Sequence, residues 1–205
     1  MSFSEFKNIP EVQKKYAIKY SETNFIKAKI LSVSSEFQQA FDFNLDHFDA
    51  FASEAARCEI IIFPVLREAY KPYAELFALW VQKSISVDKE LNGTPDYMLS
   101  KKSAYGKLYL ENPLLAVVEA KKNDFEQGWG QCLAELVAAQ KINEDESLPV
   151  YGIVTDGKNW EYGYLKGHHF YKNTKSYSID NLSELFGSLD FIFQQIVESI
   201  VDFKE

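Results

Sequence analysis

The sequence predicts a three-layer α/β domain with a small mixed central sheet, extended by an N-terminal helical segment. Residues 1–85 place apolar side chains at helical spacing, whereas residues 86–205 contain short strand-like runs separated by turn residues. Within the second part, residues 114–120 (LLAVVEA) form a continuous apolar run, which is typical of a strand covered on both faces. The chain has 205 residues and contains no repeat or flexible linker. We therefore expect one continuous domain, with residues 1–85 packed on the core and contributing to it.

The N-terminal segment is expected to contain two helical stretches. In residues 23–41, apolar side chains recur every three or four positions, which indicates an amphipathic helix. A second stretch begins near Leu45 and is expected to continue past Pro72 through YAELFALWVQKSI, which ends at Ile85. Pro64 is expected to bend or break this stretch, because proline lacks the backbone N–H that a helix interior uses.

The second part of the chain begins with strands. Residues 86–102 are predicted to form two strands around an Asn92-Gly93 turn, a dipeptide typical of tight hairpins. The apolar run 114–120 follows as the central strand. Residues 126–142 (EQGWGQCLAELVAAQKI) then carry apolar side chains along one side, which predicts a helix.

The remaining elements complete the expected domain. YGIVTD, NWEYGYL and HHFYKN predict three strands, with turns at Asp156-Gly157 and at Gly167. Residues 182–203 predict a final amphipathic helix.

Composition limits the class of protein. No stretch approaches the roughly 18 apolar residues of a membrane span, and the first residues lack the apolar region of a signal peptide. We therefore expect a cytoplasmic protein with no membrane partner. Cys58 and Cys132 are too few for a disulfide framework or a four-thiolate zinc site, so we interpret both as reduced packing residues.

The net charge of −8 is unusual for a protein that binds nucleic acid, because phosphate affinity comes from Lys and Arg. Residues 86–175 contain 11 basic and 13 acidic residues, so they carry only −2, and the flanking parts carry −6. A site for divalent cations also needs uncompensated carboxylates, and a bound ion reverses the field that a phosphate meets. The acidity is therefore compatible with a metal-dependent enzyme that acts on phosphates.

Three charged residues stand where such chemistry needs them. In VVEAKK, Glu119 and Lys121 are two positions apart on a strand, so their side chains project from one face while Ala120 points to the other. Asp96 directly follows Pro95 at the start of the neighbouring predicted strand. Phosphodiester hydrolysis uses carboxylates that hold a divalent ion, together with a cation near the attacked phosphate. Asp96 and Glu119 supply the carboxylates, and Lys121 supplies the cation.

The order GTPDYML, then EAK, then a helix with Gln131 resembles the PD-(D/E)XK nuclease superfamily. SEAARCEIIIFPVL is similar to the glutamate-bearing first helix in the nuclease domains of type I restriction enzyme motor subunits and their stand-alone relatives, and this match points to Glu54. IVTDGKNWEYGY is similar to the hairpin that follows the active-site helix there. The resemblance spans residues 53–164 and implies a restriction-endonuclease-like α/β/α core with a mixed sheet.

The resemblance also implies a metal site and a reaction. Asp96, Glu119 and the backbone carbonyl of Ala120 would ligate one or two Mg²⁺ or Mn²⁺ ions, with Glu54 completing the set. Lys121 would orient the attacking water or stabilise charge on the phosphate, and Gln131 would position the nucleic-acid backbone or the ion's water ligands.

The function implied is divalent-metal-dependent endonuclease cleavage of DNA, in restriction, defence or repair. RNA as substrate, a homodimer, and a partner chain that supplies a motor or sequence specificity remain open. One alternative is a catalytically silent module of the same fold that binds nucleic acid or a partner protein. Another is a regulatory or assembly module whose N-terminal helices form a dimer and whose nuclease-like pattern is vestigial.

Each assignment also has a purely structural interpretation. Asp96 could cap its turn, and Glu119 and Lys121 could form an ordinary charge pair. Gln131 could be a helix-surface amide. Glu54 competes for its role with three other glutamates of the same helical region, Glu59, Glu68 and Glu75.

Overall fold

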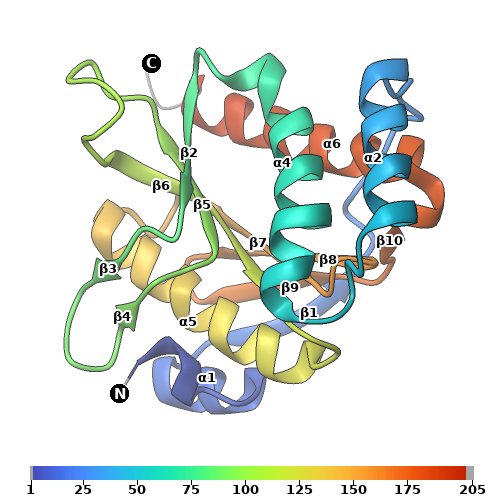
Figure 1. Ribbon diagram of the computed structural model, residues 1–205. Helices are drawn as coiled ribbons and strands as arrows, with labels where there is room; N and C mark the ends of the chain where they lie inside the picture. Colours follow the sequence, from blue (N-terminus) through green and yellow to red (C-terminus); the bar gives the residue numbers. More distant parts are fainter. Residues whose placement is uncertain (1, 202–205) are drawn as a thin grey trace.

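The computed structural model describes residues 2–201, which build a mixed β-sheet between two layers of helices (Figure 1). The strands of the described chain are β1 (Lys19–Thr23), β2 (Phe77–Val81), β3 (Ile85–Ser86), β4 (Asn92–Gly93), β5 (Tyr97–Lys101), β6 (Glu111–Ala120), β7 (Val150–Thr155), β8 (Asn159–Lys166), β9 (His169–Asn173) and β10 (Tyr177–Ser178). Eight of them form the main sheet in the order β1-β9-β8-β7-β6-β5-β2, with β10 paired to β8, while β3 and β4 pair separately. The pairs β1–β9 and β6–β7 are parallel and the other neighbours are antiparallel. The predicted α/β class with a mixed central sheet is confirmed.

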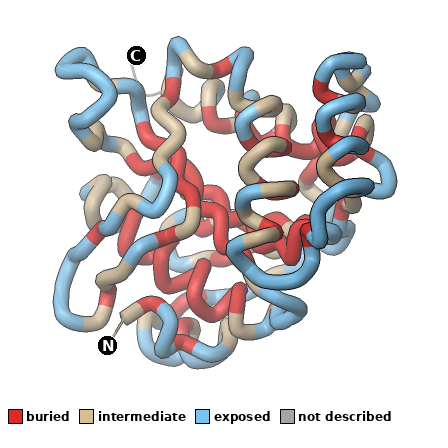
Figure 2. Tube along the Cα trace, viewed as in Figure 1, coloured by how far each residue is buried: buried red, intermediate tan, exposed pale blue. Residues whose placement is uncertain are grey.

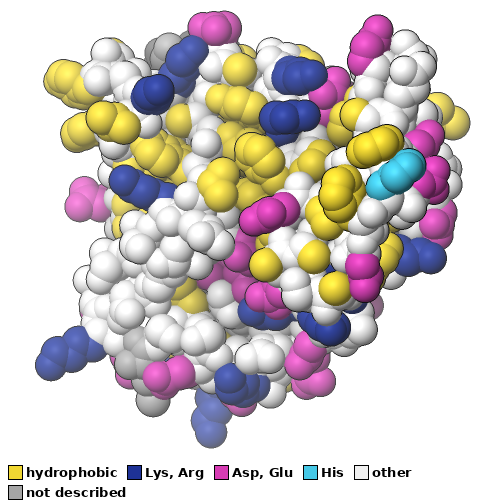
Figure 3. Space-filling model, viewed as in Figure 1, with side chains coloured by type: hydrophobic (Ala, Val, Ile, Leu, Met, Phe, Trp, Pro, Cys, Tyr) yellow, Lys and Arg dark blue, Asp and Glu magenta, His cyan; other side chains and the backbone are white. Residues whose placement is uncertain are grey.

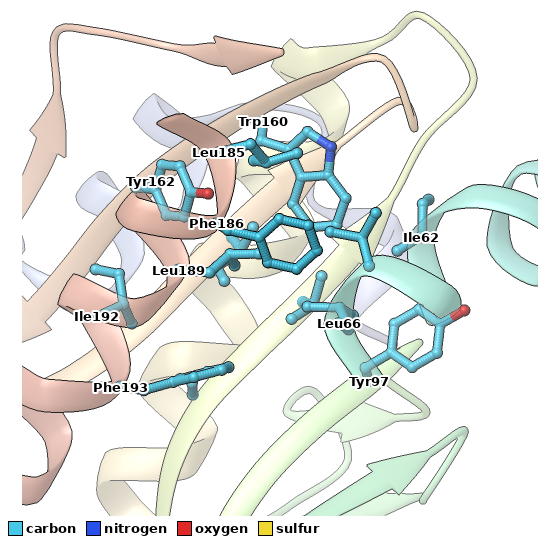
Figure 4. Close-up of a cluster of buried hydrophobic side chains, with 14 of the residues drawn as sticks. Ile62, Leu66, Tyr97, Trp160, Tyr162, Leu185, Phe186, Leu189, Ile192 and Phe193 are labelled. Atoms are coloured by element: carbon cyan, nitrogen blue, oxygen red, sulfur yellow. The ribbon is translucent and has the colours of Figure 1, made fainter. Parts of the chain in front are cut away.

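Helices cover both faces of this sheet. The α-helices are α1 (Ile9–Tyr16), α2 (Ser35–His47), α3 (Glu54–Arg57), α4 (Phe63–Tyr70), α5 (Phe125–Asn143) and α6 (Leu182–Val201), and the shorter helices are η1 (Phe3–Glu5), η2 (Cys58–Ile62), η3 (Lys71–Tyr73) and η4 (Ile179–Asn181). One face packs against α5, α1 and η1, and the other packs against α2, α4 and α6. Figure 2 shows that the buried residues concentrate in the strands and in α5. Figure 4 shows the core on the α4 and α6 side of the sheet, to which Leu66 of α4, Leu189 of α6 and Trp160 of β8 all belong.

The central strand β6 determines which layer each of its side chains faces. Leu114 and Val117 belong to the α5 core, whereas Ala116 and Val118 belong to the opposite core. Because side chains alternate along a strand, Glu119 continues the face of Val117 and lies on the α5 side.

The helix predicted over residues 23–41 is confirmed only from Ser35 onward, and its first half is wrong. Residues 24–34 have no regular structure, and α2 begins only at Ser35, with the Ser34 side chain accepting the Phe37 N–H at 3.2 Å. The Asn173 side chain accepts the N–H groups of Phe25 and Ile26 at 3.0 and 3.2 Å, which holds the segment extended. Its apolar residues cover the sheet and α6, so tertiary packing overrides the helical periodicity.

The second predicted helical stretch is divided. After α2 the helix resumes at Glu54, and Pro64 stands in the first turn of α4 without ending it. The irregularity falls just before Pro64, where η2 is a π-helical turn that widens the helix. The continuation of this helix to Ile85 is wrong, because the segment Phe77–Val81 pairs with β5 as strand β2. Residues 1–85 are thus not only helical, since β1 and β2 lie at the two edges of the main sheet.

The later elements follow the prediction closely. Asn92 and Gly93 are paired in strand β4 instead of forming the turn, but β5, β6, α5, β7, β8 and β9 are confirmed. The final helix begins at Leu182 as predicted, and its expected last residues, 202 and 203, lie outside the described residues. Cys58 and Cys132 are free cysteines, of which Cys132 is buried. None of the helices described here is long and apolar enough to cross a membrane.

Candidate active site

Asp96 and Glu119 lie at the ends of two adjacent strands. β5 begins at Tyr97, directly after Asp96, and Tyr97 pairs with Val118 of β6 in antiparallel register. The Asp96 carboxylate oxygen Oδ2 accepts the backbone N–H of Ala120 at 2.8 Å. The register therefore brings the two predicted carboxylates to one end of the sheet. Figure 3 shows Asp and Glu side chains gathered at the centre of the face where β6 ends.

Lys121 follows the last residue of β6 and turns back toward Glu119. Its Nζ lies 2.7 Å from Glu119 Oε1, which confirms that the two side chains project to the same side. The Lys121 side chain is 18% exposed and that of Glu119 only 2%, so the ammonium group reaches solvent while the carboxylate lies beneath it. The other carboxylate oxygen of Glu119, Oε2, is buried and has no hydrogen-bond partner.

The charge on Glu119 is poorly compensated. Burial and the nearby Asp96 carboxylate raise the pKa of Glu119 to about 8, although the contact with Lys121 favours the ionised form. Burial also raises the pKa of Asp96, with Glu54 adding to the rise and the hydrogen bond from Ala120 opposing it. Without a further cation, this pair of carboxylates holds a proton more tightly than isolated side chains do.

Lys121 stays charged in this setting. Burial disfavours its ammonium form, but the carboxylate of Glu119 outweighs burial, helped by Glu54 and Asp96, so the pKa of Lys121 is raised. A protonated Lys121 keeps donors available beyond the one that Glu119 accepts, since an ammonium group has three.

Gln131 hydrogen-bonds to Glu135 and not to Asp96 or Glu119, the predicted metal ligands. On α5 its Nε2 donates to Glu135 Oε1 at 3.1 Å, and its own Oε1 is buried without a partner. Glu135 is fully buried, its Oε2 also lacks a partner, and burial together with Glu119 raises its pKa well above the usual value. Gln131 and Glu135 thus form a polar layer between α5 and Glu119, and Gln131 is buried rather than a surface amide.

Glu135 was missed in the sequence although it carries a signal. It is a single acid among Cys132, Leu133, Ala134 and Leu136, where a solvated helix face would not place it. It also stands four positions after Gln131, which puts both on one side of the helix.

Glu54 lies at the margin of the cluster. It occupies the first turn of α3, capped by Ser53, and its side chain is exposed. Its charge reaches the site, because it contributes to the pKa shifts of Asp96, Glu119 and Lys121, but it shares no hydrogen bond with them among the described contacts.

The donor set suits a hard divalent cation. Asp96 and Glu119 present carboxylate oxygens, the ligands that Mg²⁺ prefers, and the partnerless Oε2 of Glu119 is an acceptor that a cation would satisfy. Within residues 2–201 no three His, Cys, Asp or Glu side chains already converge into a metal centre. The ligand kind therefore fits, and two carboxylates with a backbone carbonyl would leave the remaining positions to water, as is usual for Mg²⁺.

A tight contact with α5 fixes Lys121 in place. A Cβ added at Gly128 would lie 3.0 Å from Lys121 Cγ and 2.7 Å from Val154 Cγ1. Only glycine lets the helix approach the strand ends so closely.

Comparison with known proteins does not identify the family of this chain. No family model matches the chain, and no curated protein matches it. Among solved structures, the type IIG restriction endonuclease BpuSI is similar with a TM-score of 0.42 and 14% identity, over 75% of this chain. This chain covers 17% of that protein. A TM-score this low carries no argument about activity, so the functional inference depends on the geometry of the site.

Proposed function

We propose that this chain is a divalent-metal-dependent nuclease of the PD-(D/E)XK type that hydrolyses phosphodiester bonds of DNA. The observation that carries the proposal is the buried Glu119 carboxylate, which has one oxygen on Lys121 and the other without any donor. A structural charge pair would satisfy both oxygens, because a partnerless buried acceptor is destabilising by about 1–3 kcal/mol. A carboxyl group whose pKa is strongly raised by burial and a neighbouring acid is typical of a functional cluster.

Asp96, Glu119 and the carbonyl of Ala120 would hold Mg²⁺ or Mn²⁺, and Glu54, whose charge reaches the cluster, would bind one of the ion's waters. When bound, the ion supplies Lewis acidity to a phosphate oxygen. With no ion the cluster repels phosphate, because the acidic groups of Glu54, Asp96 and Glu119 outnumber Lys121 even when one of them is protonated. Substrate binding at the cluster is therefore expected to depend on the cation.

Lys121 carries the part of the chemistry that the chain supplies directly. Its ammonium group is held at the rim of the cluster by Glu119 and by the close approach of Gly128. From there it donates to the attacking water or to a phosphate oxygen, and its positive charge stabilises the negative charge that grows on the phosphate. The hydrogen bond from Ala120 keeps Asp96 from rotating away.

Gln131 and Glu135 contribute to the site from α5, on the side of Glu119 that faces this helix. Their mutual hydrogen bond fills the layer between α5 and Glu119 with polar groups, so Glu119 does not face a purely apolar surface. We propose that they position Glu119 and contact no substrate.

The test is cleavage of supercoiled plasmid and of single-stranded DNA with Mg²⁺, Mn²⁺ or EDTA. The purified chain is compared with Glu119→Ala and with Glu36→Ala, which removes an exposed acid on α2. The proposal expects cleavage that needs the metal, is lost in Glu119→Ala and is retained in Glu36→Ala. Absence of cleavage by all three proteins would contradict it and favour a silent module of this fold.

A further inference from the structure

The connection between β5 and β6 projects from the sheet, and most of its residues are exposed (Figures 1 and 2). We call residues 102–110 the hairpin tip. Tyr105 is 82% exposed, Leu108 83% and Tyr109 52%. The rings of Tyr105 and Tyr109 lie side by side, with centroids 5.2 Å apart. Large apolar side chains that gather in solvent mark a binding surface more often than isolated ones do.

The tip is also locally basic. Lys102 and Lys107 of the tip and the adjacent Lys101 of β5 are exposed, and no acidic residue occurs in residues 101–110, in a chain whose net charge is −8. Lys102 pairs with Glu75, but Glu75 is 93% exposed, and such surface pairs exchange readily with other ions. Figure 3 shows the dark blue and yellow side chains together at this projecting corner.

Aromatic faces interleaved with lysines match one ligand chemistry. The bases of a single strand have free faces that stack on aromatic rings, while the phosphates attract the ammonium groups. Duplex DNA hides its base faces, so it would use only the lysines. We propose that the hairpin tip is a second binding site for single-stranded nucleic acid, at which unpaired bases stack on Tyr105 and Tyr109; this rests on the proposed nuclease function for its role.

The tip has a fixed shape before any ligand binds. Ser103 Oγ donates to Glu111 Oε2 and accepts the N–H of Tyr105, both at 3.0 Å. The N–H of Tyr109 donates to the carbonyl of Gly106, whose φ of +95° favours glycine. A preordered loop loses little conformational entropy on binding.

The position of the tip relates it to the carboxylates. Strand β5 has Asp96 before its first residue and the tip after its last, and its five residues span roughly 17 Å. One strand of nucleic acid could therefore contact the tip while a phosphate several nucleotides away lies at Glu119. The tip would select single-stranded or unpaired substrate for that site.

A second exposed aromatic group provides the matched control. Phe43 and Phe48 on and after α2 are 53% and 52% exposed and contact each other, but Asp42, Asp46 and Asp49 stand beside them in the sequence. Their acidic surroundings repel phosphate, so these rings are not expected to bind nucleic acid.

The experiment is fluorescence anisotropy in EDTA with a labelled oligothymidylate of roughly 20 nucleotides and with a duplex of the same length. Loss of two stacked bases predicts that Tyr105→Ala/Tyr109→Ala weakens single-strand binding about thirtyfold or more. Duplex binding should change little, and Phe43→Ala/Phe48→Ala should bind the single strand as the unmodified chain does. Unfolding curves check that both double variants remain folded.

Unchanged single-strand affinity in Tyr105→Ala/Tyr109→Ala would overturn the proposal. So would a change in oligomeric state with unchanged affinity, which would mark the tip as a docking surface for protein. Binding in EDTA is independent of cleavage, so the two proposals fail separately. Stacking at the tip without any metal-dependent cleavage would refute only the nuclease, and cleavage with unaffected binding would refute only the tip.

Discussion

Replacing Glu119 by Gln is expected to make the metal-free protein more stable at high pH, an unusual result for a buried charged residue. Burial and Asp96 raise the pKa of Glu119 from 4.5 to about 8. A raised carboxyl pKa means that the folded state holds the proton more tightly than the unfolded chain does. Stability from this group is therefore complete below pH 4.5 and is lost as the pH rises toward 8. At about 1.4 kcal/mol per unit, the loss approaches roughly 5 kcal/mol.

Glutamine lacks this titration, so the difference in unfolding free energy between Glu119→Gln and the unmodified chain should grow by several kcal/mol from pH 4.5 to pH 9. Urea unfolding in EDTA, followed by fluorescence of the buried Trp129 and Trp160, measures it directly. Comparing the two proteins at each pH cancels the titrating groups that lie away from Glu119. Glu36→Gln, at an exposed position, should show no such growth. A difference that is constant with pH, or that shrinks, would refute the account of Glu119.

The other predictions concern the remaining members of the site. Asp96→Asn removes a charged metal ligand, so it should abolish metal-dependent cleavage. The melting temperature should not fall, because asparagine keeps an acceptor for the Ala120 N–H and relieves repulsion between carboxylates; a marked loss of stability would indicate a structural carboxylate. Lys121→Ala should retain Mn²⁺ binding and lower the cleavage rate by about 10²-fold or more, and normal cleavage would exclude the role given to Lys121. Gly128→Ala should displace Lys121 and Val154, at about 1–3 kcal/mol of stability, and reduce cleavage more than it reduces Mn²⁺ affinity; equal effects on both would show that the whole site had moved.

Local signals sufficed for the centre of the fold. The apolar run that became β6, the helix α5 and the strands β7, β8 and β9 each depend on short-range patterns, and all appear where expected. The elements at the edges of the sheet could not be predicted, because they depend on long-range contacts. β2 was mistaken for helix because its residues are apolar on both sides, and only its pairing with β5 makes it a strand. Residues 24–34 follow helical spacing but are held extended by Asn173, which lies far along the chain.

The geometry of the candidate site could also be predicted only in part. Spacing alone placed Glu119 and Lys121 side by side, and the structure brings Asp96 to the same strand end. The burial of Glu119, on which its raised pKa depends, could not be predicted, because it comes from α5 packing across the strand end. The polar layer of Gln131 and Glu135 could not be predicted either, because it also depends on how α5 packs against the sheet.

The central claim is that Glu119 is built to hold a divalent cation, and calorimetric titration with Mn²⁺ at pH 7 tests it most directly. Performed in two buffers of different ionisation enthalpy, the titration counts the protons released per ion. Because burial and Asp96 raise the pKa of Glu119 to about 8, binding at pH 7 should release protons, and Glu119→Gln should bind weakly and release fewer. Failure of the unmodified chain to bind Mn²⁺, or equal binding and proton release by Glu119→Gln, would contradict the account.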